Sequence, residues 1–459
     1  MGVGHLTPMV ELAKLFLRRG LVVTVAVPTK PGSAAAFAGA PTVASLAAAN
    51  PSISFHLLPP PPYPDPDPSR FVRMLDELRL SAPSLLALLR SLPSFAALVI
   101  DVFCAHAVDV AAALNVPAYI YCTSSAGAFA SFLHLPYYYS KTTNSIGDMG
   151  KAPLHFPGVP PIAASDMPST VQNREDGSYK ARAALYARVA EASGVLLNTL
   201  EWLEARAVKA LREGACVPDR PTPPVYCVGP LVAAGATEAG ESERHACLAW
   251  LDAQPERSVV FLCFGSVGAF SAAQVKEIAR GLETSGHRFL WVVRSPPQDP
   301  SKFIEPRREP DLEALLPDGF LGRTRGRGLV VSSWAPQVEV LRHGATGAFV
   351  THCGWNSTLE GVAAGVPLLC WPQFAEQRLN KVFIVEEMKV GVAVEGYDEE
   401  LVSAEEVEAK VRLVMESEEG ERLRERLSVA REKAAAAVAD GGPSRLAFDE
   451  FLKDLESSK

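Results

Sequence analysis

The chain has 459 residues, 48% of them hydrophobic and 21% charged, which excludes a disordered or fibrous protein and predicts two or three domains. A formal net charge of −8, without any clustered basic run, argues against nucleic acid as a partner. The eight cysteines lie scattered without a CxxC pair, so we expect reduced thiols and a cytoplasmic protein. We expect no membrane insertion, because no apolar run reaches the roughly 18 residues that a membrane span needs.

The N-terminal segment predicts a helix followed by a strand. Thr7 can cap the helix, Pro8 suits its first turn, apolar residues recur through 10–17 at helical spacing, and Gly20 ends the pattern. The run 21–28 is typical of a buried strand. This order is the second half of a β-α-β unit, and the strand that should open the unit is missing from the pattern. We therefore expect an N-terminal sheet without its first strand and a chain that folds poorly or is inactive as written. A strand and turn added before the helix should then restore its activity.

Short apolar runs alternate with helical stretches through both halves of the chain. This alternation is typical of a parallel, doubly wound α/β sheet. The runs lie at 96–101, 117–122 and 194–199 in the first half, and at 258–266, 288–293, 329–333, 347–352 and 367–372 in the second. A stretch of small and acidic residues at 234–247 is the best linker candidate. The sequence thus predicts two α/β domains, over 1–233 and 248–442.

The most informative block starts at Trp334 and includes a candidate anion site. The strand 347–351 leads into the tight turn His352-Cys353-Gly354, and a helix begins at Asn356-Ser357. An anion placed there meets free backbone N–H groups, hydroxyl and amide side chains, and the positive end of the helix dipole. This arrangement predicts a diphosphate site.

Other side chains of the block fit a nucleoside. Glu360 lies one helical turn beyond Ser357, where its carboxylate can accept hydrogen bonds from the two hydroxyls of a ribose. Trp334 presents a flat face of the size that a nucleobase covers, and Gln337 adds an amide. Taken one by one, each of these residues is more often a core side chain or a helix cap.

The whole block 334–377 resembles the plant secondary product glycosyltransferase signature of the UDP-sugar-dependent glycosyltransferases (glycosyltransferase family 1), from WAPQ through HCGWNSTLE to the closing Glu-Gln. The stretches 4–14, 101–126, 194–204, 226–231 and 258–266 are also similar to that family. The resemblance implies the GT-B architecture, in which two Rossmann-like domains face each other across a cleft. The acceptor then binds to the first domain and the nucleotide sugar to the second. The resemblance also implies that the final helix, about 443–459, packs back on the first domain. Its apolar positions Leu446, Phe448, Phe451 and Leu455 are expected to form the buried face.

The resemblance assigns the UDP-sugar site residue by residue. Uracil would stack on Trp334 and contact Ala335 and Gln337, and Glu360 would hold the ribose. The diphosphate would meet Ser266, His352, Gly354, Asn356 and Ser357. Glu376 and Gln377 would bind the hydroxyls of the sugar. Trp355 resembles the residue that family members with glucose donors carry at this position, so the implied donor is UDP-glucose.

His5 and Asp101 form the candidate catalytic pair. His5 is expected just before a helix over 8–19, where the helix dipole keeps the imidazole neutral and able to act as a base. Asp101 ends the strand 96–101, and the carboxyl edge of an open α/β sheet lines its ligand crevice. By the resemblance, His5 takes the proton of the acceptor hydroxyl and Asp101 stabilises the imidazolium.

We expect neither a metal nor another cofactor. Asp65-Pro66-Asp67 forms a D-x-D pattern, which is the metal motif of a different glycosyltransferase architecture, but prolines surround it and no strand delivers it. The helix terminus and His352 can meet the phosphate charge instead.

The leading hypothesis is an inverting glucosyltransferase, a monomer of plant secondary metabolism that forms β-O-glucosides of small phenolic or flavonoid acceptors. The acceptor class is a weaker resemblance, which rests on 101–140 and 155–162. Two alternatives stay open. One is a catalytically impaired UDP-sugar binder or truncated gene product, because the first strand is missing, and the other is a nucleotide-sugar epimerase with the GT-B layout.

Overall fold

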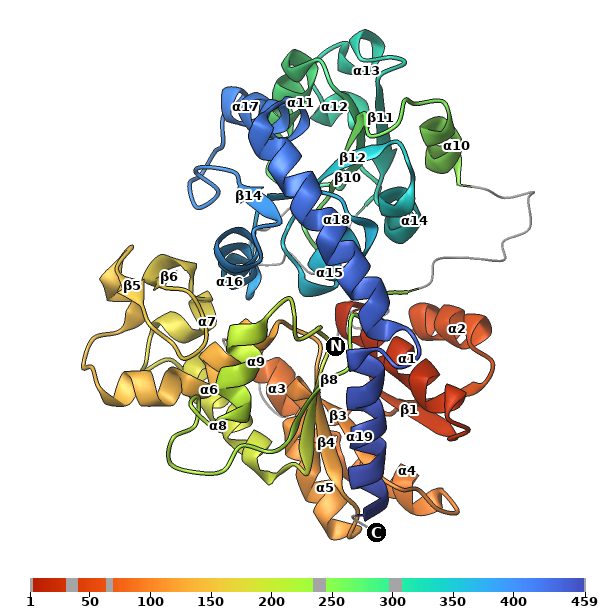
Figure 1. Cartoon of the computed structure of the whole chain (residues 1–459), viewed down its shortest axis with the longest axis vertical. Helices are drawn as coiled ribbons and strands as arrows, with labels where there is room; N and C mark the ends of the chain where they lie inside the picture. The colour runs from red at the N-terminus through yellow and green to blue at the C-terminus, as the bar shows by residue number, and fades with distance from the viewer. Residues whose placement is uncertain (1–2, 30–39, 63–68, 234–244, 297–307, 458–459) are drawn as a thin grey trace. The chain divides into compact units, whose positions relative to one another are not determined.

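The computed structural model describes residues 3–29, 40–62, 69–233, 245–296 and 308–457. The chain divides into two compact units, which we call unit 1 (Met1–Leu231 with Ala436–Lys459) and unit 2 (Val232–Ala435) (Figure 1). None of the helices in the described ranges has the length and apolar character that a membrane crossing needs.

Unit 1 contains parallel strands in two separate sheets. The strands β1 (Val23–Pro28) and β2 (Ile53–Leu58) form a pair. The other sheet has the order β3-β4-β7-β8, with bounds Leu98–Asp101, Ala118–Cys122, Gly194–Leu197 and Val225–Cys227. Within the described ranges, no strand joins β1 to β3. The pair β1–β2 and the sheet that begins at β3 are therefore separate.

Helix α1 (Val3–Arg18) packs against both sheets of unit 1. Leu6 and Val10 lie in the apolar cluster of β1 and β2, whereas Leu12 and Leu15 lie in the cluster of β4, β7 and β8. The helix begins well upstream of Pro8, so the predicted start at Pro8 is wrong. Burial of Leu6 stabilises the upstream turn as helix, and a proline near a helix N-terminus removes only one backbone hydrogen bond.

Helix α19 (Pro443–Ser457) lies along the four-stranded sheet and closes its core (Figure 1). Phe448, Phe451 and Leu455 are buried among residues of α1, β4 and β8. Leu446 is 57% exposed and does not belong to this face. The reason is geometric, because two residues correspond to about 200° around a helix, so Leu446 points away from the side that Phe448 buries.

The other elements of unit 1 cover its sheets or lie at its edge. They are α2 (Ala40–Ala49), α3 (Arg70–Leu80), α4 (Ala82–Ser91), η1 (Val102–Ala107), α5 (Val108–Ala113), α6 (Ala126–Ser140), η2 (Ile146–Met149), β5 (Pro153–Leu154), β6 (Ile162–Ala163), η3 (Ala164–Asp166), α7 (Ser169–Gln172), α8 (Gly177–Ala187), η4 (Arg188–Glu191) and α9 (Ala205–Arg212).

Unit 2 is built on one parallel sheet of order β11-β10-β9-β12-β13-β14. Its strands are β9 (Val259–Cys263), β10 (Arg288–Val293), β11 (Gly328–Ser332), β12 (Thr346–Thr351), β13 (Leu368–Cys370) and β14 (Gly391–Ala393). Its helices are α10 (Ala246–Asp252), α11 (Ala272–Ser285), α12 (Leu312–Leu315), α13 (Phe320–Arg323), α14 (Gln337–Arg342), α15 (Trp355–Ala364), α16 (Gln377–Val382), η7 (Phe383–Met388) and α17 (Ala404–Glu416). Helix α18 (Glu418–Val438) leads from unit 2 back to unit 1.

Side chains alternate between the two faces of the unit 2 sheet, as the pleat requires. One face, which includes Trp291 and Val293, packs with residues of α11 and α17. On the other face Phe261 and Phe349 stack at 5.3 Å. Because all strands run parallel, their carboxyl ends meet at one edge, and the predicted site residues follow these ends.

Candidate active site

The structure brings His5 and Asp101 of unit 1 together. His5 lies in the first turn of α1, and Asp101 is the last residue of β3. The Nδ1 atom of His5 is 2.8 Å from Oδ2 of Asp101, whose other oxygen accepts the backbone N–H of Phe103 at 2.9 Å. Asp101 is 1% exposed, whereas the side chain of His5 is 27% exposed. A buried carboxylate that accepts from Nδ1 makes Nε2 the basic nitrogen of the ring.

Thr123 is a further neighbour of His5 that the sequence analysis missed. Its Oγ1 lies 3.0 Å from His5 Nδ1, and the residue is buried. Thr123 directly follows β4, which pairs with β3. The position was recognisable as the end of a neighbouring strand, but its contact with His5 depends on how α1 packs.

One aromatic ring packs against His5, and further aromatic side chains lie beyond it. Phe103 lies 5.0 Å from it between ring centroids, and Phe71 meets Phe103 edge-on at 6.1 Å. The guanidinium of Arg182 lies over the Phe71 ring at 4.4 Å and over the Phe132 ring at 4.5 Å. Phe103 is therefore the aromatic neighbour that a flat ligand next to His5 could contact.

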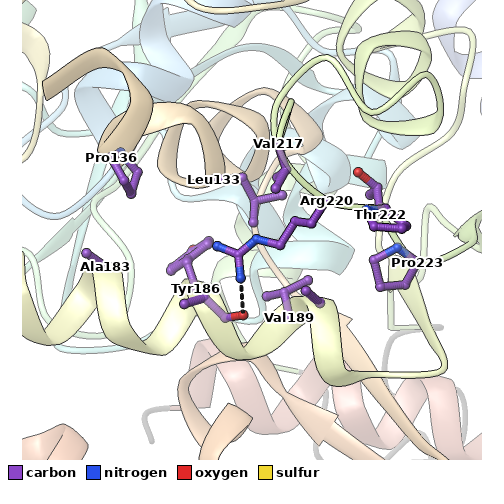
Figure 2. Close-up of a pocket in the computed structure, with 12 residues that line it drawn as sticks. Leu133, Pro136, Ala183, Tyr186, Val189, Val217, Arg220, Thr222 and Pro223 are labelled. Atoms are coloured by element: carbon purple, nitrogen blue, oxygen red, sulfur yellow. Dashed lines mark hydrogen bonds between the residues drawn. The ribbon is translucent and has the colours of Figure 1, made fainter. Parts of the chain in front are cut away.

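A separate pocket of unit 1 is not part of this arrangement. It has a volume of about 160 Å³ and lies between α6, α8 and the segment 217–223 (Figure 2). Arg220 reaches across it, and its Nη1 donates to the carbonyl of Ala187 at 3.5 Å (Figure 2). Neither His5 nor Asp101 lines it. Pockets that enclose drug-sized ligands measure roughly 300–1,000 Å³, so this pocket is too small for an acceptor of flavonoid size.

In unit 2, the turn after β12 delivers the predicted anion site. Cys353 is fully buried and adopts a left-handed conformation with φ +63°. Its N–H donates to Thr351 Oγ1 at 3.3 Å, and its carbonyl accepts from Asn380 Nδ2 at 2.9 Å. Gly354 then caps α15, whose first turn carries Asn356 and Ser357. A non-glycine residue in this conformation costs about 1–3 kcal/mol, which these buried hydrogen bonds offset.

His352 packs against two glycines at this edge. A Cβ atom at Gly265 would lie 2.5 Å from His352 Nε2, and one at Gly354 would be as close. Burial, with a smaller effect of the Arg294 charge, lowers the pKa of His352 to about 4. At neutral pH the ring is therefore uncharged. The role of His352 in meeting phosphate charge stays a prediction, and in the ligand-free protein the ring offers a hydrogen bond rather than a charge.

Gln337, Ser357 and Glu360 form a connected group. Gln337 Nε2 donates to Glu360 Oε2 at 2.6 Å and to Ser357 Oγ at 2.9 Å. Burial raises the pKa of Glu360 to about 7, although the hydrogen bond from Gln337 opposes this. Near neutral pH both the acid and the carboxylate form of Glu360, the residue assigned to a ribose, are therefore populated.

The remaining predicted residues lie around the same sheet edge. Trp334 is 62% exposed, and Ser266 is also exposed, whereas Ala335 and Trp355 are buried. Glu376 precedes the first residue of α16, Gln377.

Gln377 is 4% exposed, and its Oε1 accepts the backbone N–H groups of Gln373 at 2.9 Å and Phe374 at 3.1 Å. Its oxygen thus holds its own loop, which leaves the amide nitrogen for a sugar hydroxyl.

The D-x-D pattern at 65–67 and residues 234–244 of the predicted linker lie outside the described ranges. Within those ranges, no three His, Cys, Asp or Glu side chains group as a metal site would need.

Comparisons with known proteins identify the family of the chain. Residues 207–429 match the family described as UDP-glucoronosyl and UDP-glucosyl transferase. The chain is 44% identical over 455 residues to anthocyanidin 5,3-O-glucosyltransferase of a Rosa hybrid cultivar. The alignment covers 96% of this chain and 94% of that protein.

Solved structures show the same fold. A UDP-glucosyltransferase from Polygonum tinctorium capable of glucosylating indoxyl, in complex with 3,4-dichloroaniline, superimposes with a TM-score of 0.89 at 38% identity, over 99% of this chain and 97% of that one. Phytolacca americana UGT2 complexed with UDP-2fluoro-glucose and pterostilbene gives a TM-score of 0.85 at 35% identity, over 98% and 96% of the two chains. The α/β fold with parallel sheets in both units is therefore that of the GT-B glycosyltransferases, and the chain belongs to the family of plant UDP-glycosyltransferases.

Proposed function

We propose that this enzyme transfers glucose from UDP-glucose to a hydroxyl of a small phenolic or flavonoid acceptor, with inversion to a β-O-glucoside. The contact between His5 and Asp101 at 2.8 Å is the observation that carries the proposal, because it is a base with its orienting carboxylate. The ring of Phe103 beside His5, with Phe71 beyond it, supports a flat acceptor. The names of the rose and Phytolacca relatives, which refer to an anthocyanidin, a UDP-sugar analogue and a stilbene, support the same donor and acceptor class.

In this mechanism the acceptor hydroxyl lies next to His5 Nε2. The ring takes the hydroxyl proton while the oxygen attacks the anomeric carbon, and the bond from that carbon to the UDP oxygen breaks. Asp101 stabilises the resulting imidazolium, and Thr123 helps to fix the ring. The backbone N–H groups at the start of α15 meet the charge that develops on the leaving diphosphate. A single displacement inverts the α-linked donor.

The division of labour between domains is part of the proposal. The N-terminal domain, 1–233 with 443–459, would bind the acceptor, and the C-terminal domain, 248–442, would bind the UDP-sugar. Burial of Phe448 and Phe451 in the core of unit 1 supports the assignment of 443–459 to the first of these domains.

The test is to incubate the purified full chain with UDP-glucose and a panel of flavonoids and simple phenols. Mass spectrometry would identify the glucosides, and NMR would give the anomeric configuration. Glucoside formation with stoichiometric UDP release and β configuration is the expected result. An epimerase would convert the donor without an acceptor, and an impaired protein would bind UDP without turnover, so either outcome would contradict the proposal.

Donor preference tests the assignment of Trp355, Glu376 and Gln377. We expect kcat/KM for UDP-glucose to exceed the values for UDP-galactose and UDP-glucuronate by at least about tenfold, because a site that hydrogen-bonds specific hydroxyls rejects sugars that leave its polar groups unpaired. Steady-state kinetics with each donor would measure this ratio. Equal values for glucose and glucuronate would exclude the assigned role of Trp355.

Ionisation of Glu360 should make donor binding depend on pH. The pKa of Glu360 is about 7 without ligand, and only the carboxylate accepts from both ribose hydroxyls. The affinity for UDP-glucose should therefore rise by up to about tenfold from pH 6 to pH 8, because most of the free protein carries the protonated acid at the lower pH. Titration calorimetry at both pH values would measure the rise. UDP-glucose suits this experiment because its diphosphate is esterified at both ends.

Glu360→Gln should bind more weakly and abolish this rise. Glu313→Gln on α12, an exposed acidic residue of unit 2, is the control and should behave like the wild type. A persistent rise with pH in the Glu360 variant would show that another group titrates.

A further inference from the structure

Arg294 lies in the row of residues that follow the strand ends of unit 2. It directly follows β10, the strand between β9 and β11. Trp291 pairs with Leu262 of β9, and β9 ends at the next residue, Cys263, shortly before Gly265, the residue against which His352 packs. On the other side, the N–H of Ser333 donates to the carbonyl of Val293 at 2.8 Å, and Trp334 comes next. Arg294 therefore lies at the sheet edge that also carries the predicted base-binding and diphosphate-binding residues.

The direction of the Arg294 side chain follows from the pleat. Trp291 and Val293 point into the core on the α11 side, so Arg294 projects toward the opposite face, which is also the face of Cys263. Two electrostatic effects agree with this placement. The charge of Arg294 lowers the pKa of His352, and it partly opposes the rise that burial causes in the pKa of Cys263.

The Arg294 guanidinium has no partner in the part of the chain that the structure describes. It forms no hydrogen bond and no ion pair there, although the side chain is only partly exposed and burial lowers its pKa. A guanidinium carries five N–H donors, which an anionic ligand at this edge can accept from. A partly buried cation at the edge of a predicted ligand site is a candidate for binding that ligand.

We propose that Arg294 binds the diphosphate of the UDP-sugar and supplies the formal positive charge that the other diphosphate residues lack. His352 is uncharged at neutral pH, and Asn356 and Ser357 are neutral side chains. A guanidinium matches phosphate oxygens through two parallel hydrogen bonds. The same contact stabilises the extra charge on the leaving diphosphate, so Arg294 contributes to kcat as well as to donor affinity. This inference rests on the proposed function, because it requires a UDP-sugar donor at this edge.

The test compares UDP with uridine, which has the same base and ribose but no phosphate. Titration calorimetry would give Kd values for both ligands with the wild type and with Arg294→Gln. We expect the variant to bind UDP about tenfold to a hundredfold more weakly, as for loss of a charged hydrogen bond, and uridine unchanged within error. Equal weakening for both ligands, or no weakening for UDP, would overturn the role of Arg294.

Two further variants separate this role from a purely structural one. Arg288 lies at the opposite end of the same strand, where its Nε donates to Gln254 Oε1 at 3.1 Å. Arg288→Gln should leave the ratio of the two Kd values unchanged. Arg294→Met removes the unpaired charge but keeps the side-chain length. It should leave the Tm of the free protein close to the wild-type value and reduce the Tm increase that UDP causes, and a large loss of Tm in the free protein would show that Arg294 has a structural role instead. Wild-type protein that bound neither UDP nor uridine would overturn the donor site itself, whereas UDP binding with an unaffected Arg294→Gln would overturn only this inference.

Discussion

Replacing His5 with alanine is expected to lower kcat by about 10²–10⁴-fold, which is the usual contribution of a general base. No other described side chain combines a basic nitrogen with the contacts to Asp101 and Thr123 that orient it. Asp101→Asn should lower kcat by a smaller factor, because an amide can still orient the ring but cannot stabilise the imidazolium. Thr123→Val should have the smallest effect. Steady-state kinetics with the best acceptor from the panel would measure all three.

A matched control is available in the same unit. His56 on β2 is exposed, and His56→Ala should leave kcat unchanged. UDP affinity should be the same in the wild type and in His5→Ala, because the predicted donor residues all belong to unit 2. Wild-type kcat in His5→Ala with an ordinary phenol would show that the proposed base is wrong.

The candidate donor site was largely predictable from sequence because its residues are close in the chain. The strand, the turn at 352–354 and the helix that follows form one continuous segment, and their local geometry follows from the residue types. Arg294 and Thr123 are different. Each follows a strand that lies outside the block 334–377. Strand order and helix packing bring Arg294 to the edge that carries His352 and bring Thr123 to His5, and a single sequence does not contain that information.

Ionisation states were not predictable either. Protonation of His352 and Glu360 depends on burial, which shifts the pKa of the histidine down and that of the glutamate up. The start of α1 was predicted too late for a similar reason. Local signals at Thr7 and Pro8 favour a later start, but the burial of Leu6 against the β1–β2 pair outweighs them.

The largest stability effect is expected at Phe451. This residue is fully buried, and its ring meets Tyr119 at 4.7 Å, Tyr226 at 5.7 Å and Phe16 at 5.9 Å between centroids, each edge-on. Phe451→Ala should lower the free energy of unfolding of unit 1 by about 3–5 kcal/mol. This figure adds the lost transfer free energy of the ring to the cost of a cavity that the surrounding β-strands cannot close. Urea denaturation would measure the loss in free energy of unfolding, and hydrogen exchange of the β4 and β8 amides would show whether it falls on unit 1.

Leu446→Ala on the same helix is the matched control, because this side chain is 57% exposed and its loss should change stability by less than about 0.5 kcal/mol. The Phe451 cluster also contains Leu12 of α1, the helix that carries His5. A cavity there should therefore loosen the packing of α1 and lower kcat at temperatures where unit 1 is still folded, while UDP binding by unit 2 is unchanged. Wild-type protection of the β4 amides in Phe451→Ala would mean that α19 contributes little to the core of unit 1, and it would contradict the assignment of 443–459 to the acceptor domain.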